Sequence, residues 1–387
     1  MELNPIYANM GTTIFEHMSA LCRDGSRINL GQGFPDDAGP PELIEAAARA
    51  LRDRSNQYPP SPGVPELRDA VCDYYSRSQG LALRRDQVII TSGATEALTA
   101  AILALVAPGD EVLLFAPAFD VYAPLVRRSG GVPVFVPLQP PLWRYDRAEI
   151  ESRITPRTRA MIFNDPLNPT GTVASAAELA MIAGLCIAHD LAVISDEVWE
   201  AVRFDGQPQR SLLALPGMEH RTIKIGSAGK IFGLTGWKIG WMCAAPAAAA
   251  VLARAHQFIT FTSPPALQYA VAEGLAQPAL VADRREGWAR SRAVLAAALA
   301  RHGLVALPNA ATWFTCIDLP ASGITLNDKA FADRAVIEAG VATIPVSALC
   351  EDDPVTTVLR LCHCKPEAML EEAVERLARL RDLIGAQ

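Results

Sequence analysis

Two lysines, Lys230 and Lys238, lie eight positions apart in the stretch SAGKIFGLTGWKIGW, residues 227–241. The same stretch holds four glycines and two tryptophans, and it follows the apolar run TIKIG. Lysine is ordinarily a solvated surface residue, and glycine is unfavourable inside regular structure. Two hypotheses follow: a surface loop with incidental lysines, or a site where one lysine reacts and the other binds an anion.

Polar residues also follow three other apolar runs. Ser92-Gly93-Ala94-Thr95 follows QVIIT, a turn with two asparagines begins at Asn164 after RAMIF, and Asp196 ends LAVISD. A strand-end aspartate alone usually caps a helix, and Asn-Pro alone usually forms a turn. However, ligands of open α/β sheets bind outside the carboxyl ends of the strands, and a helix N-terminus binds anions. Together these residues predict a coenzyme site at one edge of a sheet.

The elements that must position these residues alternate between strands and helices from about residue 42 to 280. Most of the apolar runs lack the alternation of a half-exposed strand, as expected for strands buried on both faces of a largely parallel sheet. This rhythm predicts a doubly wound α/β fold. The expected strands are 87–91, 111–116, 132–138, 159–164, 191–196, 222–226 and 240–245.

A chain of 387 residues suits two domains. We expect a large domain over 42–282. After a long helix at 283–302, the strands LVALP, WFTCIDL and VLRLCHC and helices at 327–339 and 366–384 predict a smaller α+β domain. The first forty or so residues are too few to fold alone, so we expect 1–41 to pack with 283–387.

Composition excludes several classes of protein. A net charge of −7 argues against nucleic acid as a partner. No apolar run is long enough to span a membrane, and no signal peptide is apparent. Eight scattered cysteines favour a reducing cytoplasm. The residues of CHC, Cys362–Cys364, are expected to alternate faces along a strand, and no second Cys/His pair lies nearby, so we expect no metal.

The motifs NDPLNPTG, SDEVWE and SAGKIFGLTGWKIGW resemble the signatures of class I pyridoxal-phosphate (PLP) aminotransferases of fold type I. The segments INLGQGFPD and NQYPPSPGVPELRDAV resemble the branch that contains kynurenine–glutamine and methionine aminotransferases. The similarity runs from about residue 10 to the C-terminal helix. It implies a homodimer with shared active sites, and a seven-stranded, mostly parallel sheet in the large domain.

The resemblance also implies roles for the lysines. Lys230 resembles the lysine that binds the coenzyme aldehyde covalently and moves the substrate proton, a task that suits an amine of lowered pKa. Lys238 and Ser227 resemble phosphate ligands. Lys224 is expected to point outward from its strand, with no role.

Further residues match the coenzyme and carboxylate ligands of the family. Asp196 matches the carboxylate that faces the pyridine nitrogen of the coenzyme. Arg360 matches the arginine whose planar guanidinium binds the substrate α-carboxylate. Asn168 resembles the donor to the coenzyme phenolic oxygen and also a substrate ligand, with Asn164 beside it. The remaining matches are the phosphate-binding backbone of Gly93, Ala94 and Thr95, the stacking ring of Phe119, and Tyr58, which would reach the partner subunit's phosphate.

One position departs from the pattern, because Trp199 stands where relatives usually have a tyrosine that donates to the coenzyme. The expected side-chain pocket is aromatic, without a second arginine, and comprises Phe15, Gly33, Phe34, Phe261 and Trp313. It predicts transfer of the amino group of a neutral L-amino acid (methionine, aromatic or glutamine) to a 2-oxo acid by a ping-pong mechanism. The alternatives are a PLP-dependent β-lyase or other biosynthetic PLP enzyme on the same scaffold. A regulator using this fold would need a DNA-binding module before it, and the chain begins almost at the family domain.

Overall fold

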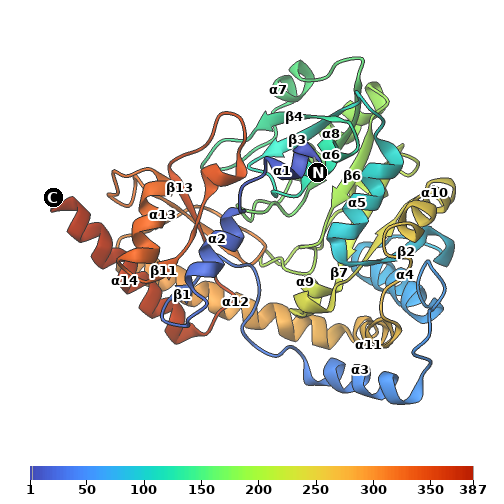
Figure 1. The fold of residues 1–387 in the computed structure, drawn as a ribbon, viewed down its shortest axis with the longest axis horizontal. Coiled ribbons are helices and arrows are strands. Elements are labelled where there is room, and N and C mark those ends of the chain that lie inside the picture. The colour runs from blue at the N-terminus through green and yellow to red at the C-terminus, as the bar shows by residue number, and fades with distance from the viewer. Residues whose placement is uncertain (2, 387) are drawn as a thin grey trace.

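The computed structural model describes residues 1 and 3–386, and its centre is a seven-stranded sheet in the order β2-β8-β7-β6-β5-β3-β4 (Figure 1). Strands β7, β6, β5, β3 and β4 run parallel, whereas β8 is antiparallel to both β2 and β7. The predicted mostly parallel sheet is therefore confirmed. The strands are β2 (Val88–Ser92), β3 (Glu111–Ala116), β4 (Val132–Pro137), β5 (Thr158–Asn164), β6 (Ala192–Asp196), β7 (Thr222–Ser227) and β8 (Ile239–Cys243).

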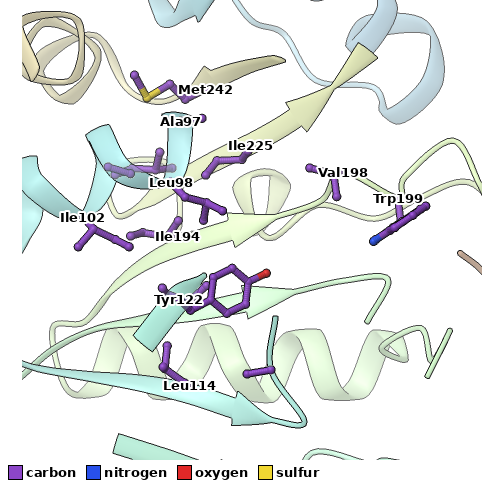
Figure 2. Close-up of a cluster of buried hydrophobic side chains, with 14 of the residues drawn as sticks. Ala97, Leu98, Ile102, Leu114, Tyr122, Ile194, Val198, Trp199, Ile225 and Met242 are labelled. Atoms are coloured by element: carbon purple, nitrogen blue, oxygen red, sulfur yellow. The ribbon is translucent and has the colours of Figure 1, made fainter. Parts of the chain in front are cut away.

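Both faces of this sheet are buried, which explains why its strands are apolar throughout. Ile162 and Ile194 face one hydrophobic cluster, while their neighbours Met161 and Val193 face another. Figure 2 shows the first cluster, where Leu98 of the helix α5 (Gly93–Leu105) lies among side chains of the strands. Helices α6 (Tyr122–Arg128) and α10 (Pro246–Gln257) also contribute to this face.

The opposite face of the sheet is covered in two parts. Helix α8 (Ala176–Ala188) packs beneath β3, β5 and β6, with α7 (Arg147–Ser152) beside it. Helices α4 (Pro65–Gln79) and α11 (Pro265–Leu275) pack beneath β2 and β8, with α3 (Pro41–Asp53) against α11. The sheet is thus held between helices, and the loops at its strand ends are left uncovered by these helices.

The C-terminal part contains a four-stranded sheet, β12-β13-β10-β9, on which helices α13 and α14 pack. The N-terminal segment joins it: β1 pairs in parallel with β11, and Met18 of α2 enters the same core. The elements are α2 (Ile14–Leu21), β1 (Ile28–Asn29), β9 (Val305–Ala306), β10 (Phe314–Asp318), α13 (Asp328–Ile337), β11 (Val341–Ala342), β12 (Ile344–Pro345), β13 (Val358–Cys362) and α14 (Glu367–Gly385). The domain boundaries at 41/42 and 282/283 remain a prediction.

Helix α12 (Pro278–Arg301) connects the two parts, and Figure 1 shows it running from beneath α9 (Ala228–Phe232) toward α14. It begins before the expected 283 because Pro278 suits the first turn of a helix. No helix within residues 1 and 3–386 is long and apolar enough to cross a membrane.

The two thiols of the CHC motif lie close together. Strand β13 ends at Cys362, and the sulfur atoms of Cys362 and Cys364 are 3.2 Å apart, as alternation along an extended chain allows for residues two positions apart. All eight cysteines are free thiols.

Candidate active site

A cavity of about 400 Å³ opens at the carboxyl ends of β5, β6 and β7, where Asn164, Asp196 and Ser227 are the last residues of their strands. Asn164 and Asp196 are register partners, so the sheet itself sets their spacing. The lining also includes Phe15, Gln32, Gly33, Gly93, Ala94, Thr95, Leu98, Phe119, Asp120, Tyr122, Asn168, Val198, Trp199, Gly229, Lys230, Thr235, Lys238, Ile239, Phe314 and Arg360.

One end of the cavity is suited to an anion. Helix α5 begins there at Gly93, and the N–H groups of a first helical turn have no acceptor inside the helix. Gly93 has a φ of +72°, and a Cβ on it would lie 3.2 Å from Nζ of Lys238. Ser227 lines the same end. A glycine is needed here because it allows both the backbone conformation and the close approach of the lysine.

Asp196 is buried in the cavity wall at 3% exposure. Its Oδ2 accepts a hydrogen bond of 2.6 Å from the Tyr122 hydroxyl, and Oδ1 accepts the N–H of Val198 at 3.3 Å. Burial raises the pKa of the Asp196 carboxyl, while these hydrogen bonds and the charge of Lys230 oppose that rise. Asn164 is tied to the same strand end, since its Nδ2 donates to the Asp196 carbonyl at 2.9 Å.

Lys230 lies on the short helix α9, directly after β7, and its amine faces the cavity. Burial lowers the pKa of Lys230 to about 8, although the charge of Asp196 acts in the opposite direction. The amine stands 4.8 Å from the ring centroid of Trp199 and 5.1 Å from that of Trp313. An amine of this pKa can both accept and release a proton near neutral pH.

Arg360 lies on β13 and reaches the cavity from the C-terminal part of the chain, almost fully buried at 1% exposure. One terminal nitrogen donates to Oδ1 of Asn168 at 3.0 Å and the other to the Gly31 carbonyl at 2.5 Å, while Nε has no partner in the described residues. Burial lowers its pKa to about 10, so the guanidinium stays charged at neutral pH. The ring of Phe314 lies over it at 3.9 Å, and Phe15 is on another side at 5.0 Å.

Not every residue expected at the site lines this cavity. Trp313 is fully buried behind Lys230, and its neighbour Phe314 lines the cavity instead. Tyr58 and Phe261 pack edge to face at 5.3 Å on the surface, outside the cavity of their own chain. Phe34 is also outside it, exposed and beneath the Lys365 amine.

The expectation that Lys224 points outward was wrong. Its side chain is fully buried, with Nζ 2.7 Å from Glu200 Oε2 and in contact with Glu197. Burial alone would lower the pKa of Lys224, but the two carboxylates raise it above its ordinary value. The strand is buried on both faces, so alternation cannot bring any of its side chains to solvent.

Comparison with known proteins identifies the family. The model for "Aminotransferase class I and II" matches residues 26–377. The methionine aminotransferase of Escherichia coli is 41% identical over 374 residues, which cover 96% of each chain. The chain belongs to the class I and II aminotransferases. The kynurenine–oxoglutarate transaminase 1 of Rattus norvegicus is 33% identical to this aminotransferase, covering 94% of each.

Solved structures agree with this assignment. The N-succinyldiaminopimelate aminotransferase of Mycobacterium tuberculosis superimposes with a TM-score of 0.93 at 40% identity, covering 98% of this chain and 100% of that one. The Escherichia coli methionine aminotransferase gives 0.94 at 39% identity over the same shares. The protein is therefore a PLP-dependent amino acid aminotransferase of fold type I, as the motifs predicted.

The residues present fit that coenzyme. The start of α5 with Lys238 and Ser227 offers donors for a phosphate, and the buried Asp196 offers a carboxylate for a ring nitrogen. Lys230 supplies the amine between them, and Phe119 supplies an aromatic face. Anion site, carboxylate and amine thus lie around one cavity.

Sequence reasoning missed several lining residues, notably Tyr122, Asp120 and Phe314. A signal existed for Tyr122, because it lies three positions after Phe119 and begins α6 beside the same strand end. No signal distinguished Phe314 from Trp313, since which of two adjacent aromatics faces a cavity depends on the register of β10 against β13.

Proposed function

We propose that this aminotransferase accepts neutral amino acids such as methionine, aromatic amino acids or glutamine, and passes the amino group to a 2-oxo acid by a ping-pong mechanism. The observation that carries the proposal is the set of cations in the cavity. Within the described residues the lining contains Lys230, Lys238 and Arg360 and no other lysine or arginine. Lys230 and Lys238 would serve the coenzyme, and Arg360 would bind the α-carboxylate that all substrates share. No cation of the lining is then left to pair with a second substrate carboxylate, and burying such a charge without a partner is unfavourable.

Bound PLP would supply an aldehyde for the amino group and a ring that accepts the electron pair left by the departing α-proton. Lys230 would hold the coenzyme and then carry that proton, because at a pKa of about 8 roughly a tenth of its amine is neutral at pH 7. Asp196, held by Tyr122, would keep the coenzyme ring nitrogen protonated.

Arg360 would bind the α-carboxylate, which fits its unpartnered Nε and planar fork. Asn168, already hydrogen-bonded to Arg360, would donate its amide to the coenzyme phenolic oxygen. Gly33 leaves no room for a side chain, since a Cβ there would be 2.7 Å from Cζ of Phe314. Phe15, Phe119 and Phe314 give the wall an apolar surface suited to an uncharged side chain.

We also propose a homodimer in the cytoplasm. Tyr58 is 82% exposed and packs against the exposed Phe261, and such exposed aromatic surface is expected for an interface. In the dimer, Tyr58 and Phe261 would reach the partner's site. The eight free thiols suit a reducing compartment.

A donor screen tests the substrate proposal. The purified holoenzyme is mixed with one amino acid, and conversion of the coenzyme to its amine form is followed by absorbance with release of one equivalent of oxo acid. We expect methionine, phenylalanine or glutamine to exceed aspartate in kcat/KM by about tenfold or more. A clear preference for aspartate would overturn the proposal, and release of ammonia without the amine form would indicate a lyase.

A further inference from the structure

A second carboxylate, Asp120, faces the cavity from the loop after β3. It is half-buried and forms no hydrogen bond or ion pair with another residue in the described part of the chain. The other acid of the lining, Asp196, has both oxygens engaged by Tyr122 and Val198. Asp120 is thus the carboxylate of the cavity lining whose charge is not offset by a direct partner in the described residues and can act on a bound ligand.

Asp120 and Arg360 line the same cavity, and each changes the pKa of the other. Burial raises the pKa of the Asp120 carboxyl and the charge of Arg360 lowers it, so the two groups influence each other across the cavity without a direct ion pair. Arg360 offsets the field of Asp120 for the α-carboxylate that it binds, whereas a second substrate carboxylate in the same cavity would meet the charge of Asp120 with no arginine of its own. In general, two carboxylates about 7 Å apart at an effective dielectric constant of about 20 repel each other by the equivalent of tenfold or more in affinity.

We propose that Asp120 is a specificity-determining residue that excludes substrates with a second carboxylate. Without a fourth cation the cavity does not stabilise a second substrate carboxylate. The unpaired carboxylate of Asp120 goes further, because it repels that group. A neutral amide of the same shape meets no such repulsion, and its N–H groups can donate to the Asp120 oxygens. This inference rests on the proposed function, because it explains how a preference for neutral side chains is enforced.

Glutamine and glutamate form a matched pair for the test, since they differ in charge and hardly in shape. We would measure kcat/KM for both donors in the half-reaction at one fixed pH, with wild type, Asp120→Asn and Asp120→Glu. The asparagine variant removes the charge at constant shape, and the glutamate variant keeps it. An unchanged coenzyme absorption spectrum serves as the check on folding.

We expect Asp120→Asn to raise the ratio of kcat/KM for glutamate to kcat/KM for glutamine by about tenfold or more. Asp120→Glu should keep the wild-type ratio. An unchanged ratio in Asp120→Asn, or an equal loss for both donors, would overturn the role in specificity. Asp120→Ser carries the same prediction if the asparagine variant is not recovered. A wild type that prefers glutamate would instead refute the proposed function, so the two failures are distinguishable.

Discussion

Three lysines in one short stretch occupy three different environments, and the environments divide their chemistry. Lys224 is fully buried between two carboxylates, which hold it as a charged ammonium. Lys238 is exposed at the start of α5, beside Gly93. Lys230 alone is both desolvated and open to the cavity, and its pKa of about 8 suits a nucleophile and proton carrier.

Trp199, the residue that departs from the family pattern, lies beside the amine of Lys230. The indole face lies 4.8 Å from the amine and stabilises its cationic form. In Trp199→Tyr, a weaker cation–π contact and a new phenol donor both favour the deprotonated form. We expect the pH at which the coenzyme-bound enzyme changes colour to fall by roughly half to one unit, with activity retained. An unchanged spectral titration would show that Trp199 does not govern this proton.

At the scale of elements, the sheet and its strand ends were predictable because buried parallel strands are apolar throughout and end in polar residues. The predicted strands of the large sheet agree with the observed ones to within two residues at each end, and 111–116 coincides with β3. The same burial misled the prediction for Lys224, since a strand covered on both faces gives no alternation from which to read direction. The two-residue strands β11 and β12 are too short for a sequence pattern, whereas β9 lies within the predicted strand LVALP.

The start of α5 is the element on which coenzyme affinity depends. Gly93→Ala places a Cβ 3.2 Å from the Lys238 amine at a φ of +72°. We expect coenzyme binding to weaken by roughly tenfold, measured by titration of the apoenzyme. Gly80→Ala is the matched control, because Gly80 has a φ of +68° but nothing within 4 Å of the added Cβ. It should lower stability without changing coenzyme affinity, and equal losses in both variants would refute a local role.

Lys224 ties β7 to the turn after β6 that carries Glu197 and Glu200. Lys224→Met leaves two carboxylates buried without their cation, so the free energy of unfolding should fall by about 3–5 kcal/mol in urea denaturation. The control Arg379→Met removes an exposed pair with Glu375 and should change stability little. A small effect of Lys224→Met would mean that Glu197 and Glu200 are not held as carboxylates by this lysine.

At the scale of the molecule, the site needs segments far apart in the sequence. Lys230 and Asp196 come from the central sheet, Arg360 from the C-terminal sheet and Phe15 from the N-terminal helix α2. The resemblance predicted all four, Phe15 as part of the side-chain pocket. The burial of Trp313 and the exposure of Phe314 to the cavity depend on the register of β10 against β13, which local sequence does not encode.

A shared site predicts an effect of Tyr58, which is exposed and outside the cavity of its own chain. Tyr58→Phe should weaken coenzyme binding by about tenfold, because one hydrogen bond to the partner's phosphate is lost. Light scattering on the same samples separates this from loss of the dimer. Unchanged coenzyme affinity in an intact dimer would show that Tyr58 does not complete the partner's site.

The central claim is that Lys230 is the lysine that binds the coenzyme. Borohydride reduction of the holoenzyme fixes the coenzyme to its lysine, and peptide mapping by mass spectrometry then locates the adduct. We predict a single adduct on Lys230, absent from Lys230→Ala, which should also lose essentially all transamination. An adduct on Lys238, Lys224 or any other lysine would contradict the account.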